Sequence, residues 1–178
     1  MLRLVRCVAV PFALAGLALA CSAGTNTHPS PPTSVEYDVE FPSTEAAVGA
    51  DTVQAYVFST STPKTDCASL LVALQGGSDL PTVVAQTDPI ALCDMLAGKG
   101  GVLSDVGYGT VSFLVVTKRA NAYYFTGCTL ATLTATSAPV QIQLAQATTA
   151  HIPTTVCNGS TDFTVTDFCG GGCTVDGG

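Results

Sequence analysis

Six cysteines in the later part of this 178-residue sequence have the clearest capacity for chemistry: Cys67, Cys93, Cys128, Cys157, Cys169 and Cys173. Thiolates bind zinc where four ligands converge and paired ligands stand two to four residues apart. The stretch CGGGC, residues 169–173, approaches that spacing. The Cys-x-x-Cys spacing of redox-active pairs does not occur. The remaining chemistry is disulfide formation, which depends on the compartment in which the domain resides.

The groups that hydrolysis would need are few. His28 lies in a proline-rich stretch, so His151 is the single candidate imidazole base, and it stands alone before Ile152-Pro153. The motifs Gly-x-Ser-x-Gly and His-Glu-x-x-His do not occur. We therefore predict no enzymatic activity. The alternative is a hydrolase that uses His151 or a pair of carboxylates in a cleft.

Two other groups of side chains could bind ligands. Glu36, Asp38 and Glu40 offer oxygen ligands to calcium. On a strand, however, they spread by roughly 7 Å per step, so a charged outer face is the favoured interpretation. In the aromatic run Tyr-Tyr-Phe, residues 123–125, successive side chains alternate between faces, so we expect Tyr124 to be exposed between buried neighbours. An exposed tyrosine could bind a glycan or a protein.

The first twenty residues have the organisation of a secretory signal peptide. Arg3 and Arg6 precede an uncharged, mostly apolar run over residues 7–20, an order typical of exported proteins. About fourteen residues of helix cover about 21 Å, whereas the hydrocarbon core of a bilayer is about 30 Å thick. We therefore predict a cleaved leader, residues 1–20, rather than a membrane span.

The fate of Cys21 after cleavage has two readings. Ala18-Leu19-Ala20 fits an ordinary signal peptidase, which would leave Cys21 as a plain N-terminal thiol. The stretch LALAC, residues 17–21, resembles the lipobox of bacterial lipoproteins, although Ala18 stands where that family usually has leucine. The resemblance implies that Cys21 carries lipid and anchors the protein to a membrane. Ser22, in place of the aspartate that retains such proteins at the inner membrane, implies the outer membrane of the cell envelope.

The residues after Cys21 have the composition of a spacer. Residues 22–34 contain three prolines and no large apolar side chain, so they cannot bury enough surface to fold. We predict that residues 21–34 comprise the lipidated cysteine and a disordered Ser/Thr/Pro tether. Residues 35–178 are long enough for one domain with its own core.

Removal of the leader leaves four basic residues and thirteen acidic ones, a net charge of −9. So acidic a chain is repelled by nucleic acid, which excludes DNA and RNA as partners. Export to an oxidising compartment favours disulfides over a metal site. We therefore predict three disulfides, no metal and no cofactor. Of the fifteen pairings, one between Cys67 and Cys128 is favoured, with the other four cysteines paired among themselves.

Alternation of apolar and polar residues predicts most of the secondary structure. It indicates strands, each with one buried face, over residues 34–41, 139–146 and 161–168. The run TVSFLVV, from Thr110, is apolar on both faces and suits a central strand. The polar stretch TKRANA, residues 117–122, predicts a hairpin. Less regular strands are expected over residues 51–59, 122–127 and 129–135.

Residues 64–97 have a different pattern, which predicts two short helices. Asp88-Pro89 is a helix start with Gly98 as its end, and Thr65 or Asp66 caps a second helix that stops at Gly76. We expect these helices to form an insertion between strands. About seven closely spaced strands predict a mainly β fold, an antiparallel β-sandwich that is Ig-like in outline.

The whole layout resembles uncharacterised bacterial lipobox lipoproteins with a single β-sandwich domain. The stretches that carry the resemblance are the lipobox, the spacer, ADTVQAYVF, VGYGTVSFLVV and TGCTLATL. The resemblance implies a lipid-anchored protein of the cell envelope that serves as a non-enzymatic binding or structural module. Its partner would be a protein or a glycan. The alternative is a hydrolase or glycan-binding protein that acts on envelope or environmental polymers.

Overall fold

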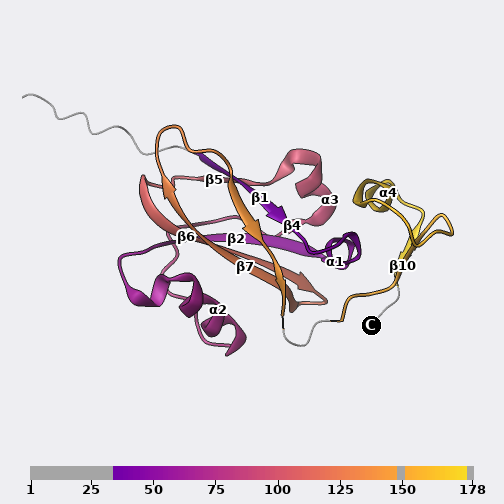
Figure 1. Ribbon diagram of the computed structural model, residues 1–178, viewed down its shortest axis with the longest axis horizontal. Helices are drawn as coiled ribbons and strands as arrows, with labels where there is room; N and C mark the ends of the chain where they lie inside the picture. Colours follow the sequence, from indigo (N-terminus) through magenta and orange to yellow (C-terminus); the bar gives the residue numbers. More distant parts are fainter. Residues whose placement is uncertain (1–33, 148–150, 176–178) are drawn as a thin grey trace, which may run out of the picture.

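The computed structural model describes residues 34–147 and 151–175. The fold is mainly β, with a large antiparallel sheet, a small mixed sheet and a two-strand C-terminal sheet (Figure 1). The leader, Cys21 and all but the last residue of the expected tether lie outside the described residues.

The large sheet has the order β3-β2-β6-β7-β9, and β4 also pairs with β2. Its strands are β2 (Thr52–Ser59), β3 (Ala85–Gln86), β4 (Ile90–Ala91), β6 (Gly109–Arg119), β7 (Ala122–Leu133) and β9 (Ala145–Gln146). The expected central strand is confirmed, because β6 lies between β2 and β7 and is buried on both faces from Val111 to Thr117. One continuous strand, β7, replaces the two strands expected over residues 122–135.

The hairpin expected over residues 117–122 is confirmed. It joins β6 to β7 through Ala120 and Asn121, whose φ angles are 46° and 67°. Positive φ at both central residues is the type I′ geometry, whose twist matches that of the strands it joins. The Asp51 carboxylate accepts a hydrogen bond from Ala120 N at 2.6 Å, so the start of β2 is fastened to this turn.

The small sheet has the order β5-β1-β8, formed by β1 (Ser34–Glu40), β5 (Val102–Ser104) and β8 (Val140–Gln143). The expectation of a wholly antiparallel structure is wrong here, because β1 and β8 run parallel. Parallel pairing requires a long connection, and most of the domain lies between these two strands. β8 leads through Leu144 directly into β9, so the chain passes from the small sheet into the large one.

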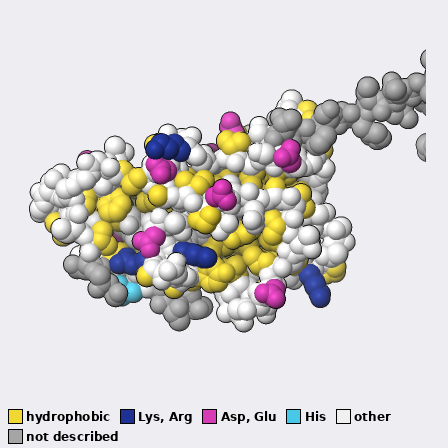
Figure 2. All heavy atoms as spheres, turned by 180° about the vertical axis from the view of Figure 1, so that it is seen from behind, with side chains coloured by type: hydrophobic (Ala, Val, Ile, Leu, Met, Phe, Trp, Pro, Cys, Tyr) yellow, Lys and Arg dark blue, Asp and Glu magenta, His cyan; other side chains and the backbone are white. Residues whose placement is uncertain are grey.

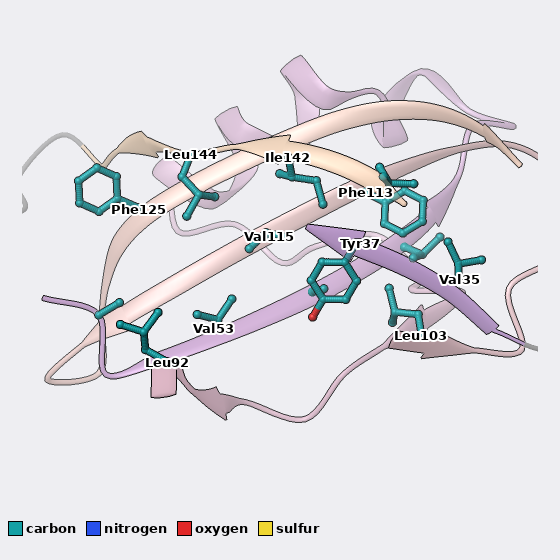
Figure 3. Packing of buried hydrophobic residues seen from close by; sticks show 14 of the residues in the cluster. Val35, Tyr37, Val53, Leu92, Leu103, Phe113, Val115, Phe125, Ile142 and Leu144 are labelled. Carbon is teal, nitrogen blue, oxygen red and sulfur yellow. The ribbon is translucent and has the colours of Figure 1, made fainter. Parts of the chain in front are cut away.

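Both sheets contribute to one hydrophobic core. The predicted alternation in residues 34–41 is confirmed, since Val35 and Tyr37 are buried and the acidic side chains between them are exposed. Val140 and Ile142 are buried in the same way on β8. Figure 3 shows Tyr37 and Ile142 gathered with Val53 of β2 and Val115 of β6. The core is thus shared by the two sheets.

Six short helical segments complete the described structure: α1 (Thr44–Val48), η1 (Pro63–Thr65), α2 (Cys67–Gln75), α3 (Leu92–Asp94), η2 (Met95–Lys99) and α4 (Val165–Gly170). The predicted ends of α2 are confirmed, because Asp66 accepts a bond from Ser69 N at 2.7 Å and the helix stops at Gly76. Leu70 and Leu74 of α2 cover Phe58 on the outer face of the large sheet. Among residues 34–147 and 151–175, no helix has the length and apolar character to cross a membrane.

Two predicted elements are wrong. The helix expected from Asp88 begins only at Leu92, because Ile90 and Ala91 pair as β4 with Val53 and Thr52 of β2. The strand expected over residues 161–168 is the helix α4, which begins with a capping box between Thr164 and Asp167. Helix α4 lies between β10 (Thr155–Cys157) and β11 (Cys173–Val175), which form the C-terminal sheet.

Candidate functional site

The six cysteines form three disulfides: Cys67–Cys128, Cys93–Cys169 and Cys157–Cys173. The first is the pairing that the sequence favoured, and the other four cysteines do pair among themselves. It holds the start of α2 on β7, with the two Cα atoms 5.3 Å apart. Within residues 34–147 and 151–175, no three His, Cys, Asp or Glu side chains are grouped as metal ligands would be.

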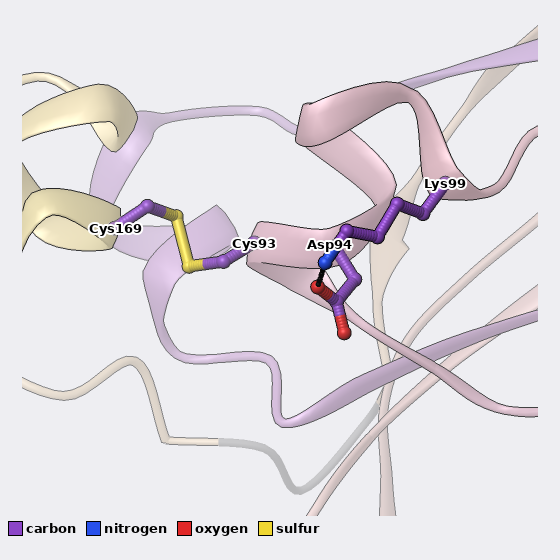
Figure 4. Close-up of polar contacts among 4 residues, drawn as sticks. All are labelled: Cys93, Asp94, Lys99 and Cys169. Atoms are coloured by element: carbon purple, nitrogen blue, oxygen red, sulfur yellow. Dashed lines mark hydrogen bonds and ion pairs between the residues drawn. A yellow bond between two sulfur atoms is a disulfide. The ribbon is translucent and has the colours of Figure 1, made fainter.

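The Cys93–Cys169 disulfide fastens the C-terminal segment to the rest of the fold. It joins α3 to α4 through two cysteines that are 76 residues apart in the chain (Figure 4). Next to it, Lys99 Nζ lies 2.7 Å from Asp94 Oδ1, and this hydrogen bond raises the pKa of Lys99. Both side chains of that ion pair are more than half exposed, so the pair adds little stability. The disulfide is the covalent link that positions α4.

The candidate base and the acidic strand residues are not brought together. His151 is exposed, and its side chain makes no hydrogen bond or ion pair with another described residue. Asp38 accepts a hydrogen bond from Gln141 Nε2 at 2.6 Å on the neighbouring strand β8. Glu40 accepts one from Gln143 Nε2 at 3.4 Å. These carboxylates therefore support the parallel pairing of β1 with β8.

The expectation for the aromatic run is wrong, because Tyr124 is 2% exposed and Tyr123 is 42% exposed. The cause is a β-bulge, in which Thr117 of β6 opposes both Tyr124 and Phe125 of β7. The extra residue interrupts the alternation of faces, so both rings enter the core and meet edge to face at 4.7 Å. Thr117 Oγ1 accepts from Phe125 N at 2.8 Å and donates to Phe125 O at 3.2 Å.

The bulge leaves Tyr123 on the outer face of the large sheet. Lys118 Nζ lies 5.6 Å from the centre of its ring, within cation–π distance. Figure 2 shows hydrophobic side chains across the middle of one face of the molecule, with scattered charged side chains between them. Tyr123 is thus one exposed aromatic residue beside one cation, without a cavity of its own among those described.

The largest cavity described, about 510 Å³, lies where four segments meet. We call it the end pocket. Its walls come from the α1–β2 connection, the β4–α3 junction, the β6–β7 turn and the C-terminal segment; they include Ala50, Asp51, Leu92, Arg119, Phe168 and Val175. Small-molecule sites commonly have volumes of roughly 300–1,000 Å³. The size and the mixed lining of the end pocket therefore suit a small ligand.

The end pocket has one acidic and one basic side chain in its walls. Asp51 is exposed and held by Ala120 N, whereas Arg119 is half-buried and its Nη1 atom is fully buried. Burial raises the pKa of the neighbouring Tyr124 phenol, and the positive charge of Arg119 opposes that rise. Gly49, also in the wall, has no room for a Cβ because the Tyr124 hydroxyl occupies the space.

The end pocket was not predicted from the sequence. Its residues come from segments separated by tens of positions, and no motif joins them. The polar stretch TKRANA, residues 117–122, contains two residues of the pocket wall. It predicted a hairpin, but it did not indicate which other segments pack against that hairpin. No family model, curated protein or solved structure matches this chain.

Proposed function

We propose that this protein is a lipid-anchored, non-enzymatic binding module of a bacterial cell envelope. The leader of residues 1–20 would be removed, Cys21 would carry the lipid, and residues 22–34 would connect it to the domain. More than one acyl chain is needed for firm attachment, and the lipobox-type modification supplies several. We further propose that the two sheets and their shared core form a β-sandwich.

The observation that carries the proposal is the set of three disulfides. Disulfides persist in oxidising compartments outside the cytoplasm and are rare inside it. All six cysteines after Cys21 are used in these bonds. An extracytoplasmic location agrees with the apolar leader, and a leader that ends directly before a cysteine favours lipid attachment over free secretion.

Intact-mass measurement of the protein from its native membrane, without reducing agent, tests the proposal. We expect a chain that begins at Cys21, an added mass of several acyl groups, and a deficit of six hydrogens for three disulfides. A Cys21→Ser variant should leave the membrane fraction, while a Ser22→Ala variant should remain in it. A chain that retains residues 1–20, or an unmodified Cys21, would show the anchor to be absent.

A further inference from the structure

The three disulfides differ in their exposure to solvent. Among the six bonded cysteines, all of which the structure describes, Cys169 alone is exposed. Its partner Cys93 is half-buried, Cys157 is buried, and the other three are half-buried. Thiol–disulfide exchange begins with the attack of a thiolate on one sulfur atom of the bond, so an accessible disulfide reacts before an enclosed one. The Cys93–Cys169 disulfide is therefore the one that a reductant reaches first.

The segment that this disulfide holds has little other attachment to the fold. No residue from Asn158 to Val175 is buried, in a range that the structure describes completely. Every hydrogen bond described for residues 158–175 has its partner within residues 155–175. Val165 of α4 packs against the core, but it is only half-buried. A unit with so few buried contacts opens at a low cost in free energy, so its position depends on the covalent bond.

The same segment forms part of the wall of the end pocket. Phe168 of α4 and Val175 of β11 line the pocket together with Val48 and Leu92, which are themselves buried. Helix α4 also packs against α1, at the end of the molecule that holds β10 (Figure 1). Departure of residues 158–175 would remove two side chains from the wall. It would therefore open the pocket and uncover apolar surface of α1 and α3.

We infer that the Cys93–Cys169 disulfide is a redox-sensitive latch, whose reduction by a dithiol releases residues 158–175 and opens the end pocket. One thiolate of the dithiol attacks Cys169 Sγ and breaks the bond to Cys93, which leaves as a thiolate and takes up a proton. The second thiolate of the dithiol then attacks the mixed disulfide and releases Cys169 in the same way. Two electrons pass to the protein, and the dithiol becomes a disulfide. The Cys157–Cys173 bond remains closed, so β10 and β11 stay joined while α4 leaves α3.

Timed reduction of the full protein tests which disulfide reacts first. Free thiols are blocked with N-ethylmaleimide and dithiothreitol is added. Newly freed thiols are then labelled with iodoacetamide and located by peptide mass. We expect Cys93 and Cys169 to be labelled about tenfold faster than the other four bonded cysteines. Reduction of either other disulfide first, or of all three at one rate, would overturn the inference.

Hydrogen exchange and dye binding test whether reduction opens the pocket. In protein reduced and labelled at Cys93 and Cys169 only, we expect the amides of α4 to exchange about tenfold faster, while those of β6 and β7 are unchanged. The fluorescence of anilinonaphthalene sulfonate should rise, because this dye binds exposed apolar surface. Unchanged exchange in α4 would show that packing holds the segment without the disulfide, and would overturn the latch.

Two double variants separate this disulfide from its neighbour. Cys93→Ser/Cys169→Ser should bind the dye without reductant and gain nothing on mild reduction. Cys67→Ser/Cys128→Ser should bind the dye only after reduction, since it retains the latch. Far-ultraviolet circular dichroism confirms folding, and a folded first variant that binds no dye would contradict the inference. The Cys21→Ser variant should show the same order of reduction, so the latch and the proposed lipid anchor fail or succeed separately.

Discussion

Thr117 stands opposite the bulge between β6 and β7 and supplies hydrogen bonds to it. Its hydroxyl both accepts from and donates to the backbone of Phe125, at 2.8 and 3.2 Å, inside the core. Thr117→Val keeps the shape but removes both of these buried hydrogen bonds, which should lower the free energy of unfolding by about 1–3 kcal/mol. Ser112→Ala is the control, because Ser112 Oγ is buried without a partner among the described residues. Denaturant titration measures both, and equal losses would refute the role of Thr117.

Gly49 allows Tyr124 to lie against the wall of the end pocket. A Cβ at this position would overlap the phenol of Tyr124 and approach Pro153 Cδ to 2.8 Å. Gly49→Ala should therefore destabilise the fold by about 1–3 kcal/mol, the usual cost of overpacking. Gly107→Ala meets nothing within 4 Å and should be neutral or slightly stabilising. Thermal unfolding compares the two variants; a neutral Gly49→Ala would mean that Tyr124 has room to move.

At the scale of elements, α4 depends on its capping box. Asp167 accepts from Thr164 Oγ1 at 2.7 Å and from Thr164 N at 2.8 Å, and these bonds lower the pKa of Asp167 below 3.8. Because the pKa of Asp167 is lower in the folded protein, its ionised carboxylate stabilises the fold fully above about pH 4. This stabilisation is lost as the pH falls through the pKa that Asp167 has in the folded protein. In Thr164→Ala the pKa should return toward 3.8, while Thr166→Ala should leave it unchanged. NMR titration of the Asp167 carboxyl carbon measures this pKa in both variants. A pKa in Thr164→Ala equal to that of the unchanged protein would refute the capping box.

Elements whose pattern is local were predictable, and those set by distant partners were not. The alternation of Val35 and Tyr37 and the cap of α2 both depend on nearby residues; the alternation was predicted correctly, and Asp66 is one of the two caps that the sequence offered. Asp88-Pro89 is a valid helix start, yet pairing with β2 draws Ile90 and Ala91 into a strand. Phe163 and Val165 alternate over too few residues to outweigh the Thr164–Asp167 box. The end pocket depends wholly on tertiary assembly, which explains why no pattern indicated it.

At the scale of the molecule, two disulfides with long closed loops should have distinct effects. The double variant Cys93→Ser/Cys169→Ser removes a disulfide between cysteines 76 residues apart. The double variant Cys67→Ser/Cys128→Ser removes one between cysteines 61 residues apart. Each pair should lower the free energy of unfolding by about 2–4 kcal/mol, since the closed loops are similar in length. Only the first should expose residues 151–175 to limited proteolysis, because only that bond joins α4 to α3. Equal cleavage of both variants would mean that the C-terminal segment is held by packing alone.

The double pairing of β1 has a mechanical consequence. β1 is hydrogen-bonded antiparallel to β5 over Ser34–Glu36 and parallel to β8 over Tyr37–Glu40. Traction on Ser34 along the strand axis loads both ladders in shear, so many bonds must rupture together instead of peeling apart singly. Survival under such traction is governed by the rate of unfolding rather than by equilibrium stability. Strand β1 should therefore give the domain mechanical resistance to force applied at Ser34.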